Sequence, residues 1–144
     1  MTLSGYSRVC VMVARVALAA VMVMAGIGKL VHEGGSDIVV VLQIEGVVTR
    51  WLAHAMERAA PLVEVVISVG MLAERLVGVS CVAGIILTSG FLYVAVAVPQ
   101  GVECNCFGMW GGFSSRQAHI TVATAMLVAF AFVMIGRSDF INMP

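Results

Sequence analysis

The stretch from Leu76 to Val98 carries no charged residue and is followed by Pro99. At about 1.5 Å per residue, one helix of that length crosses the roughly 30 Å hydrocarbon core of a bilayer. Of the 144 residues, 61% are hydrophobic and 11% are charged, and the mean hydropathy is +1.06. Soluble domains carry about 25% charged residues. We therefore expect an integral membrane protein with a single membrane domain over residues 1–144.

The same composition excludes nucleic-acid binding and intrinsic disorder. The formal net charge is zero, whereas nucleic-acid binding requires a basic surface. Intrinsic disorder requires low hydrophobicity and high net charge, and this chain has neither. The membrane lipid is the first partner that the sequence predicts.

Further apolar runs complete a set of expected spans. The first run is interrupted only by Arg15 and Lys29, and it is longer than the about 7–15 apolar residues of a signal peptide, so we expect it to be retained. The run that Pro61 opens is short, so its helix either begins earlier or carries Glu74 and Arg75 to the interface. The expected spans cover residues 9–31, 61–75, 76–98 and 119–136.

Residues 36–60 follow a different pattern. Ser36 or Asp37 could cap a new helix, and Gly46 could bend it. Trp51 lies beside Arg50, a combination typical of the membrane interface. The polar residues that recur at helical spacing are Gln43, Arg50, His54, Glu57 and Arg58. The pattern predicts an amphipathic helix on the membrane surface, or else a cap packed over the bundle.

The expected fold is an all-α membrane protein, an antiparallel four-helix bundle with this extra amphipathic helix between the first two spans. Lipid permits only helices or closed barrels, and the continuous apolar runs lack the alternation of barrel strands. The basic residues divide almost evenly between the two sides, so charge does not fix the orientation.

Two of the four cysteines, Cys104 and Cys106, lie in a glycine-rich segment after the third span. Two thiols separated by one residue can close a small, strained disulfide, and labile or catalytic disulfides are of this kind. Metal sites use the same spacing. Cys10 and Cys81 lie in apolar runs, where a thiol usually behaves as a small hydrophobic group, and we expect both to stay reduced.

Charged residues inside the apolar runs are candidate functional residues. In an antiparallel bundle Lys29 ends the first span on the side where Glu64 begins the second, near the segment with Cys104. We expect an ion pair there, either a structural pin between two helices or a cation that favours a nearby thiolate. At the opposite end, Glu74 could reach Arg15.

Three sequence elements occur in a familiar order, and together they cover roughly residues 14–136. They are Ala25-Gly26-x-x-Lys29-Leu30, Pro61-x-x-Glu64 and Cys104-x-Cys106-Phe107-Gly108. This order resembles the MauE branch of the MauE/DoxX membrane proteins. The resemblance implies a four-helix protein linked to thiol redox chemistry, with Cys104 and Cys106 as the redox pair. The middle residue is often glycine in that family and is Asn105 here, which leaves the direction of electron flow open.

The expected function is therefore that of a thiol–disulfide oxidoreductase and accessory protein of the bacterial cytoplasmic membrane. Oxidative thiol chemistry belongs outside the cytoplasm, which places Cys104 outside and both termini inside. The expected partner is an extracytoplasmic thioredoxin-like or disulfide-rich protein. A quinone could be the second molecule that exchanges electrons with the cysteine pair.

Two other functions stay open at this point. Thiolates and imidazoles suit Cu(I) or Zn(II), which would make the chain a soft-metal binder or transporter. Its ligands would be drawn from Cys104, Cys106, His32, His54 and His119. Alternatively, the chain is a non-catalytic anchor in a larger membrane complex.

Overall fold

A computed structural model describes residues 3–31, 46, 49–97 and 116–141 of the chain. Within these ranges the structure is all-helical and has no strand, as the sequence predicts. The helices are α1 (Leu3–Val31), α3 (Arg50–Leu72), α4 (Val77–Ala97) and α5 (Arg116–Ile141).

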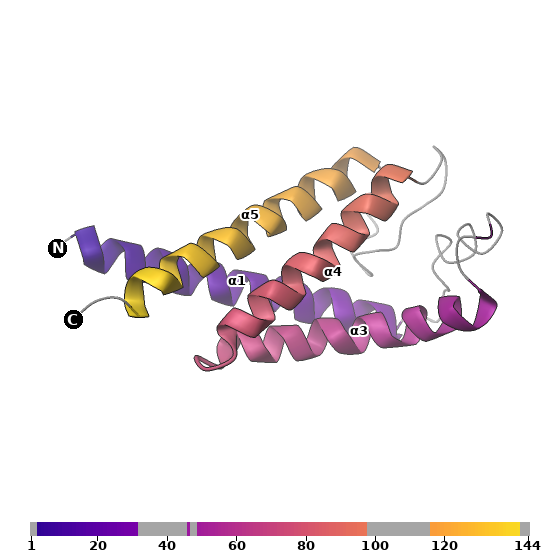
Figure 1. Cartoon of the computed structure of the whole chain (residues 1–144), viewed down its shortest axis with the longest axis horizontal. Coiled ribbons are helices and arrows are strands. Elements are labelled where there is room, and N and C mark those ends of the chain that lie inside the picture. The colour runs from indigo at the N-terminus through magenta and orange to yellow at the C-terminus, as the bar shows by residue number, and fades with distance from the viewer. Residues whose placement is uncertain (1–2, 32–45, 47–48, 98–115, 142–144) are drawn as a thin grey trace.

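The helices alternate in direction along the chain. Figure 1 shows α1 and α4 running one way and α3 and α5 running back, so that the start of α1 and the end of α5 lie at the same end. α1 packs against α3 and α5, and α4 packs against the same two helices. The described helices thus form a closed ring around one core.

Among the described residues, three helical segments are long and apolar enough to cross a membrane: Arg8–Val31, Val77–Val96 and Gln117–Gly136. Each presents large apolar side chains on its outer surface, such as Met12 on α1, Ile86 on α4 and Val128 on α5. Such a contiguous apolar exterior suits lipid and does not suit water. The expected spans 9–31, 76–98 and 119–136 correspond to these three helices.

α3 begins earlier than the expected span 61–75, which is one of the two alternatives that the short apolar run after Pro61 left open. The helix begins at Arg50, and Pro61 lies inside it. The Thr49 hydroxyl accepts a hydrogen bond from the Leu52 N–H (3.4 Å) and caps the helix. Residues 50–60, which we assigned to a separate amphipathic helix over 36–60, are therefore the first turns of α3. Ser36 and Asp37 lie outside the described residues, whereas Gly46 makes a turn with φ of +70°.

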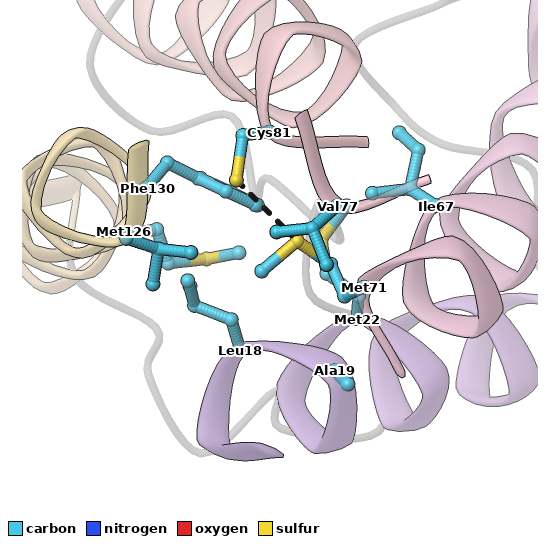
Figure 2. Close-up of a cluster of buried hydrophobic side chains, with 10 residues drawn as sticks. Leu18, Ala19, Met22, Ile67, Met71, Val77, Cys81, Met126 and Phe130 are labelled. Carbon is cyan, nitrogen blue, oxygen red and sulfur yellow. Dashed lines mark hydrogen bonds between the residues drawn. The ribbon is translucent and has the colours of Figure 1, made fainter. Parts of the chain in front are cut away.

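The core lies where the four described helices meet (Figure 2). Its buried members come from every described helix, and Phe130 of α5 is the largest of those that are fully buried. The cluster consists of Leu18, Ala19, Met22, Ile67, Met71, Val77, Cys81, Met126, Phe130 and Val133. Since all ten side chains are apolar or carry only sulfur, this part of the bundle is held by van der Waals packing.

Arg15 fixes the end of α3 against α1. Its guanidinium donates from Nε (3.1 Å) and Nη2 (2.9 Å) to the carbonyl of Met71, and Nη2 also reaches the carbonyl of Leu72 (3.4 Å). The last carbonyls of a helix lack intrahelical donors, and a cation is favourable there. Arg15 thus donates to the last carbonyls of α3, whereas the sequence suggested Glu74 as its partner.

Replacing Arg15 by methionine tests this contact. We expect Arg15→Met to lower the free energy of unfolding by about 1–2 kcal/mol, because the Met71 carbonyl loses a charged donor in a partly exposed site. Far-UV circular dichroism during titration of micelles with dodecyl sulfate would measure it. Arg75→Met, at an exposed residue beyond the end of α3, is the matched control. Equal losses in both variants would show that Arg15 has no special role.

Candidate functional site

An ion pair between α1 and α3 is the most polar feature of the described bundle. Lys29 Nζ contacts Glu64 Oε1, as the sequence predicts. The side chains are 15% and 1% exposed, respectively. Lys29 Nζ also lies 4.4 Å from the centroid of the Phe91 ring on α4, within the range of a cation–π interaction. Side chains from three helices therefore meet at the Lys29 ammonium, which is only partly exposed.

A close approach of the two backbones explains why this pair can form. A Cβ atom at Gly26 would lie 2.9 Å from the Pro61 carbonyl oxygen and 3.3 Å from Glu64 Cβ. Only glycine fits at this crossing. Gly26 and Lys29, like Pro61 and Glu64, are three residues apart and thus share one helix face. The first two elements of the family resemblance are accordingly the two sides of one helix contact.

The second carboxylate oxygen of Glu64 is unusual. Oε2 is buried and has no hydrogen-bond partner among the described residues. A buried acceptor of this kind is costly, and most buried polar atoms in proteins have a partner. Glu64 can therefore accept a further hydrogen bond, or hold a proton, while Oε1 stays on Lys29.

The predicted redox residues lie outside the described part of the chain. These are Cys104, Cys106, Phe107 and Gly108, and His32 also lies outside it. The helices that flank this segment end and begin at described positions, Ala97 of α4 and Arg116 of α5. Figure 1 shows the end of α4 and the start of α5 at the end of the bundle where α1 also ends, and Lys29 lies in the last turn of α1.

The remaining cysteines lie elsewhere in the bundle. Cys10 is exposed near the start of α1, Cys81 is buried near the start of α4, and neither forms a disulfide. By helical rise, Cys81 lies about 24 Å from the end of α4. The Cys81 thiol is therefore buried deep in the bundle, far from the end of α4 where residues 98–115 follow.

The histidines of the alternative metal site are only partly described. His54 is exposed on α3, and its Nδ1 lies 3.6 Å from Glu57 Oε2. His119 is buried in the first turns of α5. In the ranges that the structure describes, no three His, Cys, Asp or Glu side chains gather to hold a metal ion.

Two residues, one that contacts the ion pair and one that starts the helix of Glu64, have no clear signal in the sequence. Phe91 is one apolar residue among many in its span, and its contact with Lys29 depends on how α4 is rotated in the bundle. Thr49 caps α3, and a threonine before a helical run is a recognisable, though weak, start signal.

Comparison with known proteins agrees with the sequence elements. The family model of Methylamine utilisation protein MauE matches residues 7–137, a range that includes most of α1, the whole of α3 and α4, and most of α5. No curated protein and no solved structure matches the chain. The match spans the ion pair, its glycine crossing and the cysteine segment, and the chain belongs to the MauE family of methylamine utilisation proteins.

Proposed function

We propose that this MauE family protein is a membrane thiol–disulfide oxidoreductase that exchanges disulfides with an extracytoplasmic partner during the maturation of that partner. Cys104 and Cys106 are the redox pair. The observation that carries the proposal is the buried Lys29–Glu64 pair, which lies near the end of the bundle where residues 98–115 join α4 to α5. A cation held in an apolar bundle favours a thiolate nearby.

The exchange conserves electrons between the two proteins. A thiolate of the partner attacks one sulfur of the Cys104–Cys106 disulfide, forms a mixed disulfide and displaces the other sulfur as a thiolate. A second partner thiolate then resolves the mixed disulfide, so the partner is oxidised by two electrons and the Cys104–Cys106 pair is reduced. A quinone or a thioredoxin-like protein takes these electrons and restores the disulfide.

In this proposal α3 is the fourth membrane crossing. Because α1 and α4 run in the same direction (Figure 1), the chain must return between them, and α3 packs along α1. Its outer face is apolar over its second half, with exposed Leu62, Val66 and Val69. Glu64 is neutralised by Lys29 and is turned inward. A paired, inward-facing charge is the kind that membrane helices tolerate.

The proposed location is the bacterial cytoplasmic membrane, with both termini in the cytoplasm. Disulfides persist in oxidising compartments outside the cytoplasm, so the Cys104 segment faces outward. The start of α1 and the end of α5 lie at the opposite end of the bundle, which is the cytoplasmic side in this arrangement.

Substitution of the two cysteines tests the function directly. We expect Cys104→Ser and Cys106→Ser each to abolish disulfide-dependent maturation of the partner, because a single sulfur cannot complete the exchange. One of the two variants should accumulate a mixed disulfide that dithiothreitol releases, detected by acid trapping and non-reducing electrophoresis. Cys10→Ser is the matched control and should behave like the parent. Full maturation with both serine variants would contradict the relay and favour the membrane-anchor function.

A further inference from the structure

Each described helix contributes one sulfur-containing side chain to the core. Met22 comes from α1, Met71 from α3, Cys81 from α4 and Met126 from α5. All four residues are at most 6% exposed. We call this set the sulfur cluster. The other members of the surrounding core are hydrocarbon side chains, so sulfur is the only donor atom that the side chains of this core offer.

The two best-placed sulfurs are close enough to share one ion. Cys81 Sγ lies 3.6 Å from Met71 Sδ. Sulfur ligands bind metal ions at about 2.3 Å, so two sulfurs on one ion are at most about 4.6 Å apart. Figure 2 shows the Met126 side chain reaching from α5 toward Cys81 and Met71. A thiol and a thioether from two helices thus meet, and the thioethers of Met22 and Met126 belong to the same buried cluster.

We propose that the sulfur cluster binds one Cu(I) ion through the Cys81 thiolate and the Met71 and Met126 thioethers, with Met22 beside them. Thiolate and thioether ligands select soft metals, among them Cu(I) and zinc. The ion enters as Cu(I), the Cys81 thiol releases one proton to solvent, and a Cu–S bond replaces the S–H bond with no change of oxidation state. This site is distinct from Cys104 and Cys106 and does not depend on the proposed function.

The charge balance separates Cu(I) from Zn(II) at this position. One thiolate and one Cu(I) ion are neutral together, whereas one thiolate and one Zn(II) ion leave a net positive charge. An uncompensated charge in an apolar core is strongly unfavourable. The structure therefore predicts selectivity for monovalent soft ions, and Ag(I) should substitute for Cu(I).

The competing explanation is that methionine and cysteine merely fill the core, as both often do. Under that explanation, leucine in place of Met71 or Met126 changes little, because the volumes are similar. Under our proposal, the same substitution removes a ligand and weakens Cu(I) binding. The two explanations thus predict opposite results for one variant.

The test uses the full-length protein in detergent micelles, with Cys10→Ser, Cys104→Ser and Cys106→Ser so that Cys81 is the remaining thiol. Cu(I), added anaerobically as its acetonitrile complex, is competed with bathocuproine disulfonate. We expect one bound ion per chain. Loss of even an outer partner of a metal ligand costs about 10–100-fold in affinity, so Cys81→Ser should cost at least about 100-fold. Met71→Leu and Met126→Leu should each cost about tenfold or more.

Met134→Leu, at a residue of α5 that is 41% exposed, is the matched control and should bind as the parent does. X-ray absorption at the copper edge should show sulfur ligands alone. Circular dichroism identifies any variant that fails to fold, and Cys81→Ala then replaces Cys81→Ser. Absence of binding in the parent, or unchanged affinity in the Cys81 variant or in both Met→Leu variants, would overturn the proposal.

Discussion

Lys29→Met and Glu64→Gln should each lower the free energy of unfolding by about 3–5 kcal/mol, and the double variant should recover most of this loss. Removing one partner leaves the other as an uncompensated charge in a buried site, whereas removing both leaves none. The site is deep, since the Glu64 side chain is 1% exposed. Replacing Lys29 also removes the cation from the Phe91 ring.

A double-mutant cycle measures this coupling, with unfolding followed in mixed micelles of dodecyl sulfate. Glu74→Gln is the matched control, because Glu74 is exposed just beyond the end of α3. Its substitution should leave stability close to that of the parent. Additive losses for Lys29→Met and Glu64→Gln would mean that the two side chains do not interact.

The double variant also separates stability from redox chemistry. If Lys29 supports a thiolate at Cys104 or Cys106, alkylation of the reduced pair by iodoacetamide should slow in Lys29→Met/Glu64→Gln although the fold is retained. An unchanged alkylation rate would restrict the ion pair to a structural role. It would not contradict the proposed disulfide exchange at Cys104 and Cys106.

The spans could be predicted where apolar length alone decides the structure. This holds for α1, α4 and α5, whose runs are long enough to cross a bilayer. α3 could not be delimited in this way, because its first turns are polar and Pro61 resembles a helix start. The hydroxyl of Thr49 caps α3 at its start. A pattern of apolar residues contains no information about such a local hydrogen bond.

The contact between Lys29 and Glu64 was predictable for a simple reason. Few charges occur inside the apolar runs, and antiparallel packing brings the end of the first run beside the start of the run that Pro61 opens. The contacts of Phe91 and the sulfur cluster were not predictable. They depend on the rotation of each helix about its axis, and Met, Cys and Phe all count equally as apolar in a hydropathy pattern.

Phe130→Ala should lower the free energy of unfolding by about 3 kcal/mol, the lower end of the range for Phe→Ala in buried cores. Lipid is as apolar as the core, so transfer contributes little and the cavity accounts for most of the loss. Phe130 is completely buried among all four described helices. Phe132, two residues further along α5, is 44% exposed, and Phe132→Ala is the control with a smaller expected loss.

Phe130→Ala should also reverse the sign of the stability change that Gly84→Ala causes on the neighbouring helix α4. A Cβ atom at Gly84 of α4 would overlap the Phe130 ring, so Gly84→Ala should cost about 1–3 kcal/mol in the parent. Once Phe130→Ala removes the ring, Gly84→Ala should stabilise by about 0.5–1 kcal/mol, because alanine favours the helix over glycine. Gly90→Ala, which meets open space on the same helix, should stabilise both backgrounds. If Gly84→Ala has the same sign in both, the ring does not set the distance between α4 and α5.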